Sequence, residues 1–386
     1  MNILFISSSK TWGGGEVWLS QICEGLAQRG HTLVVACQPE SKILHQLSRS
    51  RFETVPLRMS GDFNPFSILK VYRLIKSRNI GLVCTNMEKE LRIAGIAAFL
   101  ANVPIIISRE IDFPIKNKNI NKFFYNHIAS GIIVNSYATY NTLLSRSPWL
   151  GKQRFEIVWK GIDIEKYRSQ PAADLRQEFN LQPEDCIAGF VGRLDEQKGI
   201  PTLLDAVKMA VKQNPRLKLV IAGEGNLYGK IRQFCQQNHL EKHIFMSGFR
   251  EDIPAFLKAI DFLVMPSYWE GFGYTAVEAM AAGKPVIGTT TSSLPEIIES
   301  GQTGTLVFPR SSNNLSKAML KMSNDRARCE KMGIAGMARV KELFQLATMI
   351  TKTESFFESL ARRIRVPATY PQRLLPGEQQ MPAHLS

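Results

Sequence analysis

Short apolar runs alternate with amphipathic stretches along the whole chain, and this alternation constrains the fold more than any other feature. The strand-like runs of the first half span residues 3–7, 32–37, 82–85, 104–108 and 131–135. Those of the second half span residues 187–191, 217–222, 244–247, 262–266 and 285–289. Helix-like stretches such as 17–29, 65–78, 200–213 and 253–259 lie between them. Strands that alternate with helices form parallel sheets with helices on both faces. The sequence therefore predicts an α/β protein with two doubly wound domains that face each other.

The length of 386 residues is sufficient for two domains of ordinary size. We expect one domain over residues 1–168 and a second over residues 169–345, with the boundary near Gly161 and Pro171. A long helical stretch from about residue 315 to residue 361 is predicted to close the chain. Within it, residues 346–365 are expected to pack back on the first domain. Residues 366–386 contain proline, glutamine and glycine without periodicity, so we expect them to be disordered.

The chain has the sequence features of a cytoplasmic protein. The first residues lack the basic and apolar regions of a signal peptide. The longest apolar stretch, residues 93–107, is interrupted by Asn102 and Pro104 and is too short to span a bilayer. It predicts a helix followed by a buried strand. The six cysteines are scattered without C-x-x-C spacing, which favours a reducing compartment and ordinary core packing.

The net charge of +14 is concentrated in the first half of the chain. Residues 1–170 contain 22 lysines and arginines against 12 acidic residues, whereas residues 171–361 contain 22 against 21. Residues 65–78 and 116–125 combine cations with apolar or aromatic side chains, which suits an anionic membrane surface. An ordinary surface helix packed on the sheet is an equally good interpretation of either segment. No nucleic-acid-binding motif accompanies the charge, so we expect no nucleic-acid partner.

Two carboxylates, Glu270 and Glu278, flank a glycine-rich turn between an apolar run and an alanine-rich helix. Gly283 and Pro285 provide the signals that end this helix. The first N–H groups of a helix are unpaired, so such a turn is a typical phosphate-binding position. Glu278 falls about one turn inside the helix, where it can accept hydrogen bonds from sugar hydroxyls, as acidic residues do in dinucleotide sites.

Arg193 and Lys198 flank a second turn that again follows a strand and precedes a helix. A guanidinium forks onto phosphate oxygens and an ammonium adds a compact charge, so together they suit a diphosphate. The alternative is a solvated turn in which these cations pair with Asp195 and Glu196. Three further turns, around Gly14, Gly223 and Gly248, could bind a ligand or could simply connect elements.

The order G-R-L-x-x-x-K-G, A-G-E-G and E-G-F-G-x-x-x-x-E-A-M-A-x-G-x-P-V-I resembles the retaining glycosyltransferases of family 4, also called glycosyl transferases group 1. The match is dense over residues 185–310. The resemblance implies the GT-B fold, in which two Rossmann-like parallel-sheet domains face each other across a cleft. It implies an N-terminal acceptor-binding domain and a C-terminal nucleotide-sugar-binding domain.

The family resemblance also implies roles for individual residues. Arg193 and Lys198 would neutralise the leaving nucleoside diphosphate, Glu270 would contact the donor sugar, and Glu278 would hold the ribose. The donor would further contact a set of turn residues from both halves of the chain: Gly14, Gly15, Gly248, Phe249, Arg250, Gly271, Phe272, Gly273, Tyr274 and Thr275.

Two positions depart from the family pattern on the acceptor side. Many relatives have a histidine at the end of a strand lining the cleft, but residues 108–112 of this chain contain none. Arg109 or Glu110 would have to replace it, and Glu16 is a further candidate on this wall of the cleft. Lys160 occupies a linker position at which the family often has asparagine.

The resemblance predicts transfer of a sugar from a nucleoside diphosphate sugar to a hydroxyl of a saccharide or lipid-linked acceptor, with retention of configuration. A UDP-sugar is expected from its prevalence in the family. Lipopolysaccharide, cell-surface polysaccharide or glycolipid synthesis is expected, at the inner face of the cytoplasmic membrane. No metal or other cofactor is expected, because the chain has no Asp-x-Asp pair. The alternatives are a non-catalytic nucleotide-sugar-binding subunit, and a phosphorylase or epimerase on the same fold.

Overall fold

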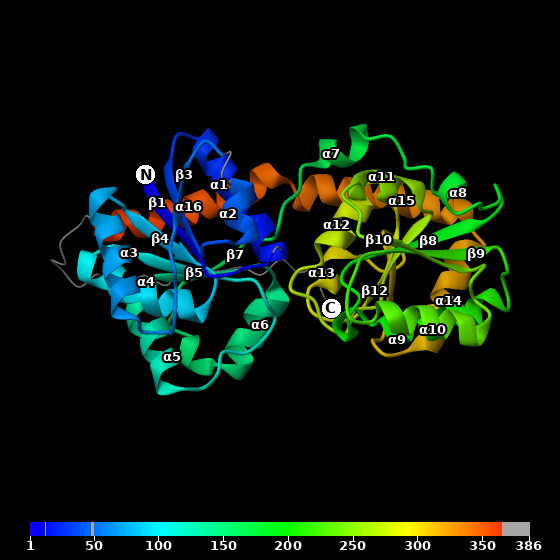
Figure 1. Ribbon diagram of the computed structural model, residues 1–386, viewed down its shortest axis with the longest axis horizontal. Coiled ribbons are helices and arrows are strands. Elements are labelled where there is room, and N and C mark those ends of the chain that lie inside the picture. Colours follow the sequence, from blue (N-terminus) through cyan, green and yellow to red (C-terminus); the bar gives the residue numbers. More distant parts are fainter. Residues whose placement is uncertain (12, 48–49, 365–386) are drawn as a thin grey trace, which may run out of the picture.

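The computed structural model describes residues 1–11, 13–47 and 50–364, which form two lobes (Figure 1). Each lobe contains one parallel sheet. The first sheet has seven strands in the order β3-β2-β1-β4-β5-β6-β7, and the second has six in the order β10-β9-β8-β11-β12-β13. The predicted pair of doubly wound α/β domains is therefore confirmed. The tail over residues 366–386, expected to be disordered, lies outside the described residues.

The first sheet is formed by β1 (Asn2–Ser7), β2 (Thr32–Cys37), β3 (Glu53–Pro56), β4 (Leu82–Thr85), β5 (Ile105–Arg109), β6 (Gly131–Val134) and β7 (Phe155–Ile157). Its helices are α1 (Gly14–Gln28), α2 (Lys42–Leu47), α3 (Pro65–Ser77), α4 (Glu88–Ala101), α5 (Asn119–Phe123), the π-helical turn η1 (Phe124–Ile128) and α6 (Tyr137–Arg146). Five strands lie within one residue of their predicted bounds. The sequence pattern missed β3 and β7 because both are short edge strands without a continuous buried run.

The second sheet is formed by β8 (Cys186–Val191), β9 (Leu217–Ala222), β10 (Ile244–Gly248), β11 (Phe262–Met265), β12 (Val286–Thr289) and β13 (Gly304–Val307). Its helices are α9 (Ile200–Val211), α10 (Tyr228–Asn238), α11 (Ile253–Ala259), α12 (Tyr274–Ala281) and α13 (Leu294–Ile297), and the 3-10 turn η3 (Glu196–Lys198) precedes α9. The edge strand β13 was not predicted, because it too is short and only partly buried. Two short helices, α7 (Ile164–Ser169) and α8 (Leu175–Glu178), link the two sheets.

The C-terminal part differs from the single long helical stretch expected over residues 315–361. It forms three helices, α14 (Ser312–Ser323), α15 (Arg326–Leu343) and α16 (Leu346–Ile364). The Asp325 side chain caps the start of α15 by accepting a hydrogen bond from the backbone N–H of Arg328, so the helix restarts there. The break before α16 coincides with the linker, where Ile162 exchanges backbone hydrogen bonds with Phe344 and Leu346.

Helix α16 crosses from the second lobe to the first (Figure 1). There Phe357 packs against Phe5 of β1, with ring centroids 6.1 Å apart. Arg29 and His31 both contact the Glu354 carboxylate. Helix α16 is thus part of the N-terminal lobe although it follows the second domain in the sequence.

The carboxyl ends of the strands of both sheets point toward the gap between the lobes. Asn135, which follows β6, donates its side-chain N–H to the carbonyl oxygens of Glu110 and Gly271 at 3.0 and 3.1 Å. Glu110 follows β5 and Gly271 follows β11, so this one amide joins the two sheets. Open α/β sheets bind ligands at this edge, and here two such edges meet.

Candidate active site

A cavity of about 310 Å³ lies between the two lobes, at the carboxyl ends of their strands. Residues of both domains form its walls. They are Gly14, Gly15, Glu110, Ile111, Asn135 and Lys160 from the first domain and its linker, and Lys198, Met265, Glu270, Gly271, Phe272, Gly273, Tyr274 and Thr275 from the second. Most residues predicted to contact the donor sugar and its phosphates therefore lie in a single cavity.

Lys198 and Glu270, which are 72 residues apart in sequence, form an ion pair in this cavity. The Lys198 Nζ lies 2.6 Å from Oε1 of Glu270. The same carboxylate oxygen accepts a hydrogen bond of 2.6 Å from the Ser267 hydroxyl. Glu270 is buried, so its charge is compensated by a fixed ammonium and a fixed hydroxyl rather than by water. A polar ligand in the cavity would meet a preorganised cation and a carboxylate next to each other.

Arg193 does not line the cavity, and its side chain extends into solvent. Its side chain is 70% exposed, and Nη2 lies 3.2 Å from Oδ2 of Asp195. The same nitrogen donates to Oε1 of Gln197 at 2.9 Å. The ion pair between Arg193 and Asp195 is one of the contacts expected if this segment is simply a solvated turn. The guanidinium would have to turn inward to reach a diphosphate in the cavity.

The turn from Glu270 to Tyr274 offers mainly backbone groups to the cavity. Gly273 has φ +96°, a conformation that favours glycine, and α12 begins there without a side-chain cap. A Cβ on Gly271 would lie 2.5 Å from the carbonyl oxygen of Glu110, so only glycine allows the two lobes to approach this closely. The Phe272 ring is buried and packs 5.9 Å from Phe344, so its backbone rather than its side chain is available to a ligand.

Glu278 lies one turn into α12 and is not among the residues that line the cavity. Its Oε1 accepts a hydrogen bond of 2.7 Å from the Tyr167 hydroxyl, which comes from linker helix α7. Burial raises the pKa of Glu278, and the hydrogen bond from Tyr167 opposes this rise. Sequence reasoning missed Tyr167, because nothing local in the linker connects it to a helix more than 100 residues away.

The turn Gly248-Phe249-Arg250 follows β10, the edge strand of the second sheet. Arg250 is held by Asp252 and Glu178, and these hydrogen bonds raise the pKa of its guanidinium. Phe249 is largely exposed. Two strands separate β10 from β11 in the sheet, so this turn stands apart from the cavity. Its contact with a donor base stays a prediction.

Glu110 lies on the N-terminal wall of the cavity and is paired with Lys160. The Lys160 Nζ lies 2.7 Å from Oε1 and 2.6 Å from Oε2 of Glu110, and the Ser108 hydroxyl donates to Oε1 at 2.5 Å. Lys160 is only 1% exposed and its Nζ lies 4.2 Å from the ring centroid of Trp18. Burial lowers the pKa of Lys160, and the Glu110 charge opposes this effect. The lysine that departs from the family pattern is thus the partner of Glu110.

Arg109 is the last residue of β5, and its side chain is buried outside the cavity lining. Its Nη1 lies 2.6 Å from Oε1 of Glu88, and its Nη2 donates to the carbonyl oxygen of Phe113 at 3.2 Å. Of the two candidates to replace the histidine, Glu110 lines the cavity and Arg109 does not. Glu16 lies in the first turn of α1, half-buried and outside the cavity lining.

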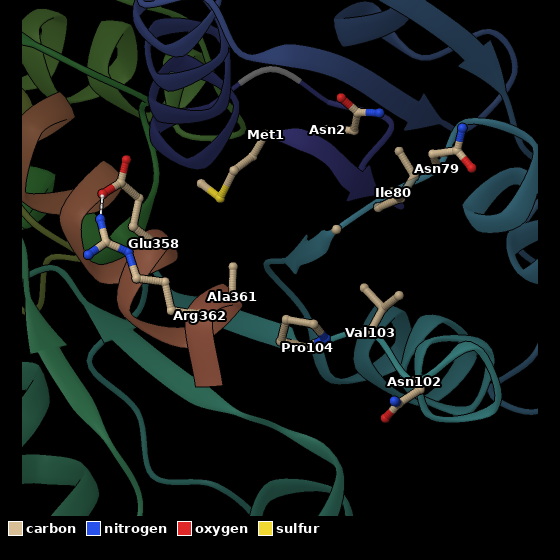
Figure 2. A pocket seen from close by; sticks show the side chains of 11 residues that line it. Met1, Asn2, Asn79, Ile80, Asn102, Val103, Pro104, Glu358, Ala361 and Arg362 are labelled. Atoms are coloured by element: carbon tan, nitrogen blue, oxygen red, sulfur yellow. Dashed lines mark hydrogen bonds and ion pairs between the residues drawn. The ribbon is translucent and has the colours of Figure 1, made fainter. Parts of the chain in front are cut away.

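A second cavity of about 500 Å³ lies at the opposite, amino-terminal edge of the first sheet (Figure 2). Its walls include Met1, Asn2 and Pro104, together with the end of α16. Figure 2 shows that two charged side chains at its border, Glu358 and Arg362, are directed at each other, and an ion pair of 3.0 Å joins them. The cavity between the lobes differs in that two close ion pairs, Lys198–Glu270 and Lys160–Glu110, line it.

The described part of the chain contains no group of three or more histidine, cysteine, aspartate or glutamate side chains that could hold a metal ion. All six cysteines are buried and unpaired, as the sequence predicts. Among the described helices, none is both long enough and apolar enough to cross a membrane.

The same fold is found in solved glycosyltransferases. HepE of Anabaena in complex with UDP superposes with a TM-score of 0.80 at 23% identity, covering 93% of this chain and 100% of HepE. A glycosyltransferase from Rickettsia africae superposes with a TM-score of 0.83 at 20% identity, covering 93% of this chain and 98% of that protein. The chain therefore has the two-domain GT-B fold of these structures.

Family models cover both domains. Glycosyltransferase Family 4 matches residues 12–166 and Glycosyl transferases group 1 matches residues 172–339. The chain belongs to the family-4 glycosyltransferases. It is 26% identical over 276 residues to the UDP-Gal:alpha-D-GlcNAc-diphosphoundecaprenol alpha-1,3-galactosyltransferase of Escherichia coli, covering 67% of this chain and 70% of that protein. It is 26% identical to the lipopolysaccharide core mannosyltransferase LpsB of Rhizobium meliloti, covering 53% of this chain and 61% of that protein.

Proposed function

We propose that this glycosyltransferase moves a sugar from a nucleoside diphosphate sugar, with a UDP-sugar as first choice, to a hydroxyl of a saccharide or lipid-linked acceptor. The configuration of the transferred sugar is retained. The ion pair between Lys198 and Glu270, in a cavity between the strand ends of both domains, is the observation that supports this most directly. It places a cation for the phosphate and a carboxylate for the sugar hydroxyls side by side, with Lys198 Nζ 2.6 Å from Oε1 of Glu270.

The mechanism follows from the charges that develop as the sugar–phosphate bond breaks. Positive charge grows on the sugar and negative charge grows on the leaving phosphate. Fixed cations bind the phosphate more strongly as this charge develops, and that difference lowers the barrier. Lys198 supplies a fixed cation in the cavity, and Arg193 supplies a second once its exposed side chain turns inward, so we propose no metal and no other cofactor. The acceptor hydroxyl attacks from the face that the diphosphate leaves, and a phosphate oxygen takes its proton.

The named relatives support the choice of substrates. The Escherichia coli relative is named as a UDP-galactose enzyme acting on a diphosphoundecaprenol-linked sugar, and HepE was solved with UDP. The Rhizobium meliloti relative is named for lipopolysaccharide core synthesis. We therefore propose a UDP-sugar donor and a role in lipopolysaccharide, cell-surface polysaccharide or glycolipid synthesis.

The surface of the first domain supports a membrane-associated acceptor. Helix α3 exposes Phe66, Lys70 and Arg73 along one stripe at helical spacing. Near its start, Phe63 packs 6.0 Å from Phe124, and the exposed Phe123 packs 5.7 Å from the same ring. Aromatic rings beside cations suit the interface of an anionic bilayer. We propose that the protein is cytoplasmic and binds the inner face of the cytoplasmic membrane through this surface.

Donor turnover by the purified chain tests the proposed function. UDP release from UDP-galactose and UDP-glucose is measured with and without added saccharide. Arg193→Ala should lose about 2–3 kcal/mol of transition-state stabilisation, roughly 30- to 150-fold in rate. Arg326→Ala is the matched control, because this arginine is also solvent-exposed but lies at the start of α15, far from the cavity.

A rate near that of the unmodified chain in Arg193→Ala would refute the assigned role of the guanidinium. Glu270→Ala separates the sugar from the nucleotide, since it should weaken donor use while calorimetry still detects UDP binding. An equal loss of both would contradict this division of roles. Binding of UDP without any release of UDP from either donor would instead indicate a non-catalytic nucleotide-sugar-binding subunit.

A further inference from the structure

Two aromatic rings from different domains meet beside the cavity. Phe113 follows β5 in the first domain and Trp269 follows β11 in the second, and their ring centroids lie 6.0 Å apart at an interplanar angle of 76°. Trp269 directly precedes Glu270, and Phe113 lies two residues after Ile111, so each ring is next to a residue of the cavity wall. Both remain accessible to solvent, Phe113 by 46% and Trp269 by 36%.

The backbone beneath each ring is fixed by a side chain. The buried Arg109 donates to the carbonyl oxygen of Phe113 at 3.2 Å and is itself paired with Glu88. Gln197 donates to the carbonyl oxygen of Trp269 at 3.2 Å. The two rings are therefore presented from anchored loops while their outer surfaces face solvent. Large aromatic side chains held in this way within a polar cleft are typical of a ligand-binding surface.

The chemistry of the surroundings indicates which ligand fits. A pyranose ring has a face of C–H groups, which packs on the electron-rich face of an aromatic ring, and an edge of hydroxyls, which needs acceptors. Phe113 and Trp269 meet edge to face, and each keeps part of its ring surface exposed to solvent. The carboxylate of Glu110, three residues before Phe113, lines the adjoining cavity and can accept from hydroxyls. Glu270 is already assigned to the donor sugar, which leaves Glu110 for a second saccharide.

We propose that Phe113 and Trp269 form a subsite for a pyranose ring of the acceptor, with Glu110 accepting hydrogen bonds from its hydroxyls. This inference rests on the proposed function, since it names the acceptor side of the same cleft. Because one ring comes from each domain, the subsite is complete only when the two lobes approach as they do here. Arg109, one of the two candidates to replace the missing histidine, contributes by fixing the loop that carries Phe113.

Saturation-transfer NMR on the full chain with UDP bound tests the subsite. The probes are the methyl β-glycosides of glucose, galactose and N-acetylglucosamine. We expect transfer to the pyranose protons of at least one probe. Trp269→Ala and Phe113→Ala should each weaken its binding about tenfold, a typical loss for one aromatic contact. Trp269→Phe keeps a ring at this position and should restore most of the affinity.

Phe99→Ala is the matched control, because Phe99 is 68% exposed on α4 and lies outside the cavity lining. Glycoside affinity that is unchanged in Phe113→Ala and Trp269→Ala, or reduced equally in Phe99→Ala, would overturn the subsite. So would the absence of pyranose signals for every probe while UDP remains bound. Failure of the unmodified chain to bind UDP or to turn over either UDP-sugar would count against the proposed function instead.

Discussion

The buried ion pair between Lys160 and Glu110 should be a large local contribution to stability. Lys160→Met removes the ammonium but keeps a long apolar side chain against the Trp18 ring. It leaves the Glu110 carboxylate in the cavity wall with the Ser108 hydroxyl as its remaining recorded side-chain partner. Removing one partner of a buried pair costs about 3–5 kcal/mol, because the other charge loses its compensation. The Glu110 side chain keeps 14% exposure in the cavity wall, so water solvates part of its charge and the lower end of this range is expected. Urea denaturation should therefore show a marked fall in the free energy of unfolding.

The double variant Lys160→Met/Glu110→Gln isolates the charge from the packing. A neutral amide needs no counter-ion, so the double variant should recover about 1–3 kcal/mol relative to the sum of the single changes. Lys218→Met is the control, since its ammonium lies 3.7 Å from Asp185 and makes a looser pair. A loss below about 1 kcal/mol in Lys160→Met, or additive single changes, would refute the reasoning.

Three further perturbations have defined outcomes. Tyr167→Phe removes a hydrogen bond that opposes the raised pKa of Glu278, so the fall of UDP affinity at acid pH should move to higher pH in calorimetry. Gly161→Ala places a Cβ 2.5 Å from a backbone oxygen and should cost about 1–3 kcal/mol in urea denaturation. Hydrogen bonds, of which that with His31 has the largest effect, lower the pKa of Glu354. The Glu354 carboxylate therefore stabilises the fold fully above the ordinary glutamate pKa, and this stabilisation is lost as pH falls through the lowered pKa. Glu354→Gln should flatten this acid limb in thermal unfolding.

Each of these changes has a matched control. Tyr228→Phe alters a half-exposed tyrosine of α10, and Gly229→Ala adds a Cβ where no atom lies within 4 Å. Glu358→Gln alters a glutamate of α16 whose recorded partner is one turn away on the same helix. An acid limb of UDP binding that does not shift in Tyr167→Phe would contradict the first prediction. Equal stability of Gly161→Ala and Gly229→Ala would contradict the second. Identical acid limbs with and without Glu354 would contradict the third.

The sequence determined the fold class and the contiguous part of the site. Parallel strands buried on both faces appear as continuous apolar runs, so the central strands were located within a residue or two. The turn and α12 were predicted together, because Gly273 precedes the helix and Gly283 follows its end within one short segment. The edge strands β3, β7 and β13 were missed, since a half-buried strand of three or four residues lacks such a run.

Only the tertiary structure decided which distant residues become partners. Lys160 and Glu110 are 50 residues apart, and their pairing depends on the linker returning beside the end of β5. Arg109 and Glu110 are equivalent candidates in the sequence, but neighbouring side chains at a strand end point to opposite faces, so only Glu110 reaches the cavity. The spacing of residues within one segment predicts what a single turn and its helix can bind. The wall facing it comes from loops of another sheet, whose approach is set by the packing of the two domains.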